Sequence, residues 1–519
     1  MQHTAPIYPG SACPASPAGR WIEIVYEASL LDDAARPSLV FTDGNGAAHR
    51  MMAPAPVLGR AIWIGPVPRS AVALHLESHT PLRIVRVTRR GALWRGAKAL
   101  LRHPKHTAAA FALAALGRPA RAQKRLARAL TEQPLANFKA WAAPRRRPHE
   151  PDGLDKPAFP RADIRVDLAP GESLTPWALD AVSAAFAADP ALAAVRGDSD
   201  NETEAGFASA WTPGRGALFT RQGPTGPVRH IRTILTRGAP HPPAPIPTPP
   251  EPSEWPSVTV IVPTRDRLEL LQTCIDGVLT GTDYPDLTLV IADNDSAEAT
   301  THAYFCALAM RDPRVRIVPC PGPFNFSAIN NRAVSQNAGA MLAFLNNDIA
   351  VKDPGWLKAM VRLALQPETG AVGATLLYPN GRIQHAGVAI GPGGVAGHVL
   401  RDKPPGALAG IAGPRRVSAV TGACLVVQRA RFEAAGGFDP AFPVDYNDID
   451  LCLRLDAHGW RCVWSPETVL IHRESASRGR DKGIPEAVKL FQERWAGRIQ
   501  DDPCFHPAFS ENALDLALG

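Results

Sequence analysis

The second half of this 519-residue chain predicts an α/β fold, a mostly parallel sheet with helices on both faces. Two observations support this fold class. From residue 257 on, continuous apolar runs of strand length alternate with amphipathic runs of helix length, which is typical of parallel strands joined by helices. Three of the apolar runs end on clusters of Asn, Asp and Thr, as strands do when their carboxyl ends form a binding site.

The predicted elements follow one another in a regular order. The strands read V-T-V-I-V-P-T-R-D-R, L-T-L-V-I-A-D-N-D-S, V-R-I-V-P and M-L-A-F-L-N-N-D. Helices are expected over 268–280, 326–339 and 356–366, where apolar residues recur at helical spacing. A turn of small residues, 420–424, leads into a further apolar strand.

Polar clusters at the strand ends predict one binding site. They are Thr264-Arg265-Asp266, Asp293-Asn294-Asp295 and Asn346-Asn347-Asp348. Amide and carboxylate groups match the donors and acceptors of a nucleotide base. Carboxylates and phosphate oxygens together can hold Mg²⁺ or Mn²⁺, and the cation then stabilises a departing diphosphate. One cluster alone is weak evidence, because acids after strands often cap the next helix, but three in one sheet are stronger evidence.

Further titratable groups follow along the chain. Asp448 and Asp450 open a helix with apolar residues between and after them. Both carboxylates could interact with the helix N-terminus, or one could point into the site and act as a general base for an acceptor hydroxyl. His472 ends the strand V-L-I-H. A lone histidine at a strand end is usually structural, but imidazole is also a common ligand of Mn²⁺-type ions.

Eight ordered motifs resemble those of the family 2 glycosyltransferases. They read P-T-R-D-R, I-A-D-N-D-S, P-F-N-F-S-A-I-N-N, F-L-N-N-D-I, I-Q-H-A-G-V, V-T-G-A-C, Y-N-D-I-D-L-C-L-R and H-R-E-S-A-S-R-G. The resemblance covers about 257–480 and is most similar to the bacterial rhamnosyltransferase-like enzymes of O-antigen and surface-polysaccharide synthesis. It implies a GT-A fold, a nucleotide-sugar donor, a divalent cation (Mn²⁺ or Mg²⁺) and inversion at the anomeric carbon.

The resemblance also implies roles for single residues. Those implied to line the nucleotide site are Pro263, Thr264, Asp266, Asp293, Asn294, Asn346 and Asn347. Asp348 would be the direct metal contact, His472 would complete the metal and diphosphate site, and Asp448 would be the catalytic base. The sequence departs from the family pattern at two positions: Asn346 replaces the first Asp of the D-x-D triplet, and Asn447 replaces the Glu that often precedes the base.

The implied activity is an inverting transfer of a sugar from a UDP- or dTDP-sugar, with dTDP-rhamnose as one candidate. The acceptor would be a glycan or lipid-linked glycan in cell-surface polysaccharide synthesis. A nucleotidyltransferase is a rival, but it would need a glycine-rich, lysine-bearing loop where P-T-R-D-R stands. Another rival is a non-catalytic nucleotide-sugar or glycan-binding scaffold of a polysaccharide assembly complex. Intact Asp348, Asp448 and His472 argue against that scaffold.

The boundaries of the domains follow from shifts in composition, and the resemblance implies the two GT-A assignments. The expected segments are a disordered N-terminus (1–18), a small β-sandwich (19–88), a basic helical segment (89–150), a truncated GT-A-like remnant (151–238), a proline-rich linker (239–256), the GT-A domain (257–480) and a C-terminal helical tail (481–519). Short apolar strands between Gly, Pro and Asn turns predict the sandwich, whose role is docking or carbohydrate binding. Nine prolines in 18 residues mark the linker.

The basic character of the chain belongs to one segment. Residues 80–148 contain 17 Lys and Arg and one acid, Glu132, which gives this segment a net charge of +16. The whole chain has a net charge of +7, so the remaining residues sum to −9. Leu, Trp and Ala recur there at helical spacing between the basic residues. Three interpretations remain open: a solvated connector, attachment to the anionic inner membrane surface, and nucleic-acid binding, which lacks any reading motif.

Residues 161–237 resemble the end of a first transferase domain in tandem relatives. The similar stretches are D-S-D-N-E, W-T-P and H-I-R-T-I-L, and the position of the D-x-D triplet reads A-P-G-E. We therefore expect a shortened, inactive remnant, in which the acidic turn is structural rather than a calcium loop.

The eight cysteines form no C-x-x-C pair, which argues against a zinc site or a disulfide framework. Neither a leader nor an apolar run long enough for a bilayer is present. We expect a cytoplasmic protein, peripheral at the inner face of the plasma membrane if the basic segment touches lipid.

Overall fold

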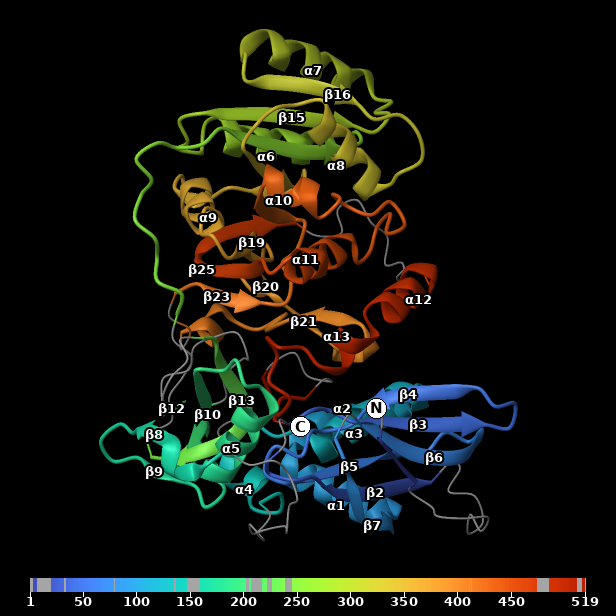
Figure 1. Cartoon of the computed structure of the whole chain (residues 1–519). Coiled ribbons are helices and arrows are strands. Elements are labelled where there is room, and N and C mark those ends of the chain that lie inside the picture. Colours follow the sequence, from blue (N-terminus) through green and yellow to red (C-terminus); the bar gives the residue numbers. More distant parts are fainter. Residues whose placement is uncertain are drawn as a thin grey trace. The chain divides into compact units, whose positions relative to one another are not determined.

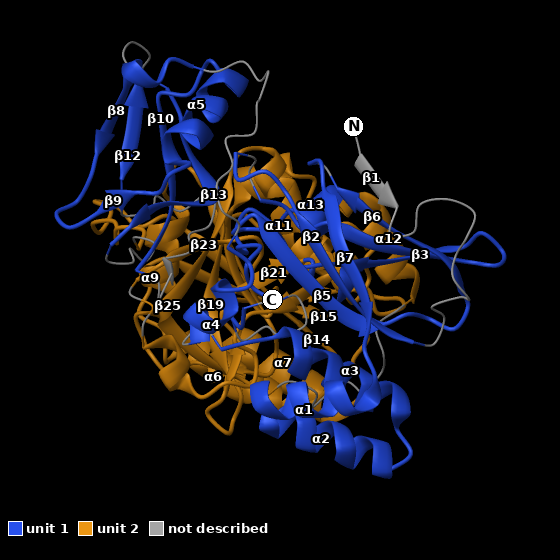
Figure 2. Ribbon diagram, turned by 90° about the horizontal axis from the view of Figure 1, so that it is seen from below, with its two compact units in different colours: residues 1–244, 391–394, 497–519 blue, residues 245–390, 395–496 orange. Residues whose placement is uncertain are grey.

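The computed structural model divides the chain into two compact units (Figures 1 and 2). Unit 1 comprises residues 1–244, 391–394 and 497–519, and unit 2 comprises 245–390 and 395–496. The structure describes residues 3–6, 20–31, 34–78, 80–134, 137–146, 159–201, 205–206, 217–221, 226–238, 245–409, 411, 413–473, 485–510 and 516–518.

Unit 2 is built on a ten-stranded sheet with the order β16-β15-β14-β17-β24-β19-β25-β18, in which β20 pairs with β19 and β23 with β25. Its strands are β14 (Val258–Thr264), β15 (Leu287–Asp293), β16 (Val315–Pro319), β17 (Met341–Leu345), β18 (Ile349–Ala350), β19 (Thr369–Leu377), β20 (Ile383–His385), β23 (Arg415–Val417), β24 (Cys424–Gln428) and β25 (Arg461–His472). A separate hairpin joins β21 (Val388–Ile390) and β22 (Ala396–His398).

The strands of unit 2 alternate with helices along the chain. The helices are α6 (Leu268–Leu279), α7 (Ala299–Arg311), α8 (Phe326–Ser335), α9 (Trp356–Ala364), α10 (Arg429–Ala434), α11 (Asn447–Ala457) and α12 (Pro485–Arg494). In α6, Leu271, Ile275 and Val278 recur at helical spacing and are fully buried in the core of the sheet. The sequence predicts α6, α8 and α9, but not α7.

The predicted α/β class is confirmed, and the sheet is mixed. β16, β15, β14 and β17 are parallel to one another, whereas β24 runs antiparallel to both β17 and β19. β19 and β25 are again parallel. The antiparallel β24 brings its first residues to the edge at which β17 ends, which matters for the site below.

Unit 1 begins with two antiparallel sheets. One has the order β1-β6-β3-β4 and the other β5-β2-β7. The strands are β1 (His3–Pro6), β2 (Trp21–Glu27), β3 (Ser38–Asp43), β4 (Ala48–Met52), β5 (Arg60–Pro66), β6 (Ala71–Ser78) and β7 (Arg83–Arg89). Tyr26 and Trp63 of one sheet share a core with Leu39 and Leu76 of the other, which makes a β-sandwich.

The N-terminus differs from the expected disorder over 1–18, because residues 3–6 form β1, which pairs with β6. The remaining residues of that segment lie outside the described part of the chain. A segment rich in small residues and proline is expected to be disordered. Its pairing with β6 depends instead on the sandwich, because β6 lies about seventy residues away in the sequence.

The basic segment folds into α1 (Ala92–Arg102), α2 (Pro104–Ala115), α3 (Pro119–Thr131) and α4 (Phe138–Ala142). Ala99 of α1 and Ala129 and Leu130 of α3 are buried together with Trp21 and Ile64 of the sandwich. The first three helices lie side by side in Figure 2. No helix of the described residues is long and apolar enough to cross a membrane.

A third layer of unit 1 contains a small mixed sheet covered by α5 (Ala178–Ala188). Its strands are β8 (Ile164–Asp167), β9 (Ser173–Leu174), β10 (Ala194–Asp200), β11 (Ala205–Gly206), β12 (Leu218–Arg221) and β13 (Val228–Arg237). The expected tail 481–519 is divided, since α12 belongs to unit 2 and residues 497–519, with most of α13 (Ala496–Gln500), belong to unit 1.

The acidic turn of this layer is structural. Asp198 accepts hydrogen bonds from His230 Nε2 at 2.9 Å and from His506 Nε2 at 2.8 Å, and Asp200 pairs with Arg146. These partners hold the pKa of Asp198 at about 2, although its burial alone would raise it. The W-T-P stretch, which resembles part of a first transferase domain in tandem relatives, lies outside the described residues.

Candidate active site

The carboxyl ends of three parallel strands meet at one edge of the unit 2 sheet. Thr264 of β14 lies opposite Asp293 of β15, and β17, the other neighbour of β14, ends just before Asn346. Asn347 donates a hydrogen bond from Nδ2 to Thr264 Oγ1 at 2.9 Å, which joins two of the predicted clusters directly. The predicted positions Pro263, Thr264 and Asn347 are thus neighbours at this edge.

Asp348 and His472 are brought together by the pairing of β18 with β25. Ile349 lies opposite His472 in that ladder, and Arg473 donates its backbone N–H to the carbonyl of Asp348 at 3.1 Å. As a result, His472 Nε2 lies 3.0 Å from Asp348 Oδ1. Both side chains are nearly buried.

Gln384 of β20 orients the imidazole. Its Oε1 lies 2.7 Å from His472 Nδ1. An amide oxygen only accepts hydrogen bonds, so Nδ1 carries a proton and a neutral imidazole leaves Nε2 with a lone pair. Asn346 Nδ2, 3.3 Å from Nε2, donates toward that lone pair.

This arrangement fits a divalent cation. Asp348 Oδ1 lies 3.0 Å from His472 Nε2, so one divalent cation can be bound by both atoms when the imidazole is neutral. An octahedral Mg²⁺ with ligands at about 2.1 Å places neighbouring ligands about 3.0 Å apart. No cluster of three or more His, Cys, Asp or Glu that could hold a metal occurs among the described residues. A cation here would therefore take its other ligands from phosphate and water.

The other predicted nucleotide residues have structural partners. Asp266 Oδ1 accepts the backbone N–H groups of Ala297 and Glu298, both at 2.9 Å, at the start of α7. Asp293 Oδ1 accepts from the backbone of Ser296 at 3.1 Å. Asn294 is buried and donates from Nδ2 to the carbonyls of Cys320 and Gly322, at 2.8 and 2.9 Å. These contacts shape the loops that border the strand ends.

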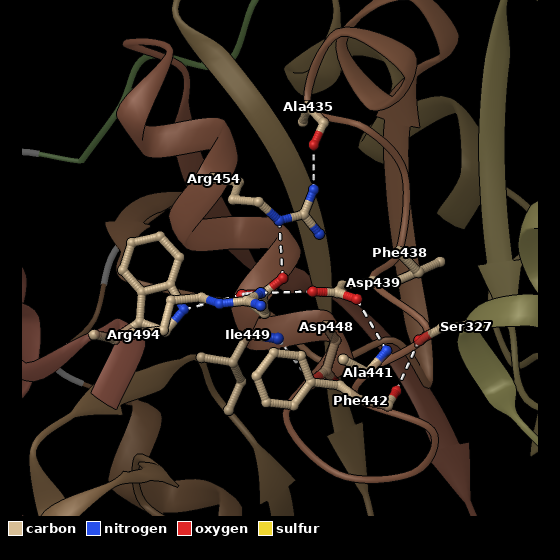
Figure 3. Close-up of polar contacts among 12 residues, drawn as sticks. Ser327, Ala435, Phe438, Asp439, Ala441, Phe442, Asp448, Ile449, Arg454 and Arg494 are labelled. Carbon is tan, nitrogen blue, oxygen red and sulfur yellow. Dashed lines mark hydrogen bonds and ion pairs between the residues drawn. The ribbon is translucent and has the colours of Figure 1, made fainter. Parts of the chain in front are cut away.

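Two carboxylates at the start of α11 have different surroundings (Figure 3). Asp450 is fully buried and accepts from Arg454 Nε at 2.8 Å, Arg494 at 2.9 Å and Trp495 Nε1 at 3.0 Å. Asp448 is only half-buried and accepts from backbone groups instead: Gly422 N at 2.7 Å and Ile449 N at 2.8 Å. Asp450 is therefore neutralised by cations, while Asp448 has no ion pair among the described residues.

The surroundings of Asp448 raise its pKa from the ordinary value for Asp. Desolvation is the largest cause, and the backbone N–H groups of Gly422 and Ile449 oppose it. A carboxylate with a raised pKa is a stronger base than one exposed to water.

Short backbone links connect Asp448 to the candidate cation ligands. Asn346 donates its backbone N–H to the carbonyl of Ala423 at 3.0 Å. Gly422, the residue before Ala423, donates its backbone N–H to the carboxylate of Asp448. The two residues before β24 thus lie between Asp448 and the Asn346–Asp348 cluster, because β24 runs antiparallel to β17.

Two further histidines, His385 and His398, lie close to each other near His472. His385 is fully buried, and its Nδ1 lies 2.8 Å from Nδ1 of His398. Desolvation, together with the neighbouring His398 and His472, lowers the pKa of His385 well below its ordinary value. His385 is therefore neutral near pH 7 and adds no positive charge beside the candidate cation ligands.

Some residues of the site carry no local signal in the sequence. Arg494 and Trp495 fall in the segment expected to be a tail, yet Arg494 forms an ion pair with Asp450, more than forty residues earlier, and Trp495 donates a hydrogen bond to it. Gln384 stands in the I-Q-H-A-G-V motif, but its contact with His472 depends on two strands, β20 and β25, that flank β19. The E-S-A-S-R-G stretch after Arg473 lies outside the described residues.

The mixed α/β sheet, with Asp348, His472 and the half-buried Asp448 at the edge where its strands end, has the architecture of the GT-A class. Residues 256–498 match the family model described as Glycosyltransferase like family 2. This part of the chain is a family 2 glycosyltransferase domain.

Individual relatives point to bacterial polysaccharide enzymes. The chain is 42% identical over 271 residues to the O-antigen biosynthesis protein RfbC of Myxococcus xanthus, covering 51% of this chain and 21% of that protein. It is 27% identical over 230 residues to the N-acetylglucosaminyl-diphospho-decaprenol L-rhamnosyltransferase of Mycobacterium tuberculosis, covering 38% of this chain and 69% of that protein. The chain spans less than a third of the length of the two relatives that it matches at 42% identity.

Among solved structures, the chain is similar to the mannosyltransferase PcManGT from Pyrobaculum calidifontis in complex with GDP-Man and Mn²⁺. It has 20% sequence identity and a TM-score of 0.36, over 50% of this chain and 74% of that chain.

Proposed function

We propose that this chain transfers a sugar from a nucleotide-diphosphate-sugar to a glycan acceptor, with inversion, in cell-surface polysaccharide synthesis. The observation that carries this proposal is the link from Asp448 through Gly422 and Ala423 to Asn346. It places a carboxylate that has no ion pair among the described residues at the same strand edge as two candidate cation ligands, Asp348 and His472.

The proposed reaction is a single in-line displacement. Asp448 takes the proton from an acceptor hydroxyl, and the hydroxyl oxygen forms a bond to the anomeric carbon of the donor. The bond from that carbon to the diphosphate oxygen breaks on the opposite face, so the nucleoside diphosphate leaves with the electron pair and the configuration inverts. A cation bound at Asp348 and His472 would stabilise the charge on the departing diphosphate.

The donor is proposed to be a UDP- or dTDP-sugar, with dTDP-rhamnose as the first candidate. Support comes from the rhamnosyltransferase among the relatives. Thr264 and Asn347, joined at the strand ends, would lie under the nucleotide together with Pro263. Asp266, Asp293 and Asn294 would contribute by shaping the two loops beside it, and each of these side chains keeps oxygen acceptor capacity for a base or ribose.

We also propose that the enzyme works at the inner face of the plasma membrane on a lipid-linked glycan. The name of the decaprenol-dependent relative supports a lipid-linked acceptor. The layer formed by residues 159–238 is proposed to be an inactive remnant of a first transferase domain. Its acidic residues Asp198 and Asp200 pair with side chains of the protein, Asp198 with His230 and His506 and Asp200 with Arg146, which supports that proposal.

The test is release of nucleoside diphosphate from a panel of UDP-, dTDP- and GDP-sugars with the purified chain, Mn²⁺ and a lipid-linked glycan acceptor. We expect release with one donor class, loss of it with EDTA, and loss of it in Asp448→Asn. A binding scaffold would instead be stabilised against heat by a nucleotide-sugar and would release no diphosphate with any donor.

A further inference from the structure

The first helix of the basic segment has its polarity reversed. A surface helix normally buries its apolar stripe and exposes its charges. In α1, Leu93, Ala97, Leu100 and Leu101 share one face and are all exposed.

The charged face of α1 packs against the protein instead. The guanidinium of Arg95 lies 4.8 Å from the ring centre of Trp21, and Arg102 donates to the carbonyl of Leu130 in α3. Lys98 lies 6.0 Å from the ring of Trp94. These contacts fix the orientation of α1, so its leucines cannot turn inward without breaking them.

The second helix also exposes large apolar side chains. From Thr107 to Leu116 the sequence contains no charged residue, yet Phe111 is 64% and Leu116 70% exposed. In α1, Leu93 is 92%, Leu101 84% and Leu100 57% exposed. These five side chains are five of the twelve large apolar side chains exposed in the described part of the chain.

The charge around this surface selects its partner. Residues 92–131 contain nine Lys and Arg and no Asp or Glu, and Lys105, Arg118, Arg121 and Lys124 are exposed beside α2. A second copy would bring like charges together. Nucleic acid would leave the five apolar side chains without a role, because its outer surface is phosphate. A bilayer with anionic headgroups accepts both the apolar side chains and the cations.

We infer that the α1–α2 surface (Leu93, Leu100, Leu101, Phe111 and Leu116 with the surrounding Lys and Arg) is a docking site for an anionic lipid bilayer. The five side chains enter the boundary between headgroups and acyl chains, and the basic residues contact the headgroups. The inference names the membrane contact of the proposed function, but it concerns helices of unit 1 and not the transferase site.

The test is cosedimentation of the full chain with vesicles of phosphatidylglycerol and phosphatidylcholine in equal amounts, compared with vesicles of phosphatidylcholine alone. We expect binding to the mixed vesicles that weakens with added salt. The double variant Leu101→Ser, Phe111→Ser removes two apolar contacts and should weaken binding about a hundredfold, by about a factor of ten for each lost side chain. Arg121→Gln with Lys124→Gln should reduce the preference for phosphatidylglycerol.

Met310→Ser is the matched control, because Met310 is an equally exposed apolar side chain, at 89%, on α7 of unit 2. It should bind vesicles as the parent chain does. Equal binding by the parent and the Leu101/Phe111 variant would overturn the inference. So would a parent chain that does not bind vesicles, or a parent dimer that the same variant converts to a monomer.

Transfer to a soluble acceptor should be unchanged in these variants. Their results therefore separate failure of membrane docking from failure of the proposed transferase activity.

Discussion

The side chains of Gln384 and His472 are joined by a 2.7 Å hydrogen bond although they lie 88 residues apart in the sequence. This bond sets which imidazole nitrogen carries the proton. It leaves Nε2 facing Asp348, and thus prepares two ligands for one cation.

Replacing Gln384 tests this positioning role. Gln384→Met removes the acceptor, so the imidazole can rotate or exchange tautomers, and we expect Mn²⁺ affinity to fall by about 10- to 100-fold. Gln384→Glu keeps an acceptor and should retain Mn²⁺ binding. Titration of free Mn²⁺ by electron paramagnetic resonance measures the affinity without the reaction. Equal Mn²⁺ affinity in Gln384→Met and the parent would contradict the role of Gln384.

Asp448 and Asp450 should respond differently to the same substitution. Asp448→Asn removes the proposed base, and we expect kcat to fall by about 10²- to 10⁴-fold while the melting temperature changes little. Asp450→Asn removes the carboxylate that pairs with Arg454, while Arg494 keeps Asp439 at 2.7 Å, and should lower the free energy of unfolding by about 3 kcal/mol. Steady-state kinetics and thermal unfolding of both variants provide the comparison. A near-parental transfer rate in Asp448→Asn would exclude it as the base.

The pH dependence of transfer should report the raised pKa of Asp448. Only the deprotonated carboxylate can take a proton, so kcat/KM should fall on the acid side. Because burial raises this pKa, the fall should begin at a higher pH than for an exposed carboxyl, whose pKa is about 3.9. The measurement is kcat/KM against pH with a saturating cation. An acid limb at or below the ordinary range of Asp would argue that another group is the base.

Unit 1 should lose stability in acid through Asp198 and His506. Desolvation lowers the pKa of His506 in the folded chain below its ordinary value of about 6.5. As the pH falls below that value, the unfolded chain binds the proton more strongly than the folded chain, so the folded state loses stability. The pKa of Asp198 is lowered to about 2, so its contribution is complete above about 3.9 and is lost as the pH falls toward 2. Both effects have the same sign, and unfolding followed by circular dichroism against pH should show a progressive loss.

Asp198→Ala leaves two buried imidazoles without an acceptor and should lower the free energy of unfolding by about 3 kcal/mol near pH 7. Asp167→Ala is the control, since Asp167 is exposed on β8 of the same layer. A loss of stability in the control as large as in Asp198→Ala would show that the cluster is not the cause.

Much of the fold could be predicted from local patterns. The runs that become β14, β15 and β17 are apolar over strand length, and each stops at a polar cluster within one residue or two. Such patterns depend only on residues close together in the sequence, so they can be recognised without knowledge of the fold. The helix α7 carries a weaker apolar pattern, with Thr301, Phe305 and Leu308 as its buried residues, and was not predicted.

The sequence by itself determined the order of strands and helices, the polar clusters at the strand ends, the two candidate bases at 448 and 450, and the basic segment. Only the tertiary structure decided that Arg454 and Arg494 neutralise Asp450 and leave Asp448 to backbone N–H groups. It alone joined Asp348, His472 and Gln384, and turned the leucines of α1 outward. The reason is physical: periodicity acts over a few residues, whereas the charge, proton and solvent exposure of a side chain are set by groups that the fold brings from tens or hundreds of residues away.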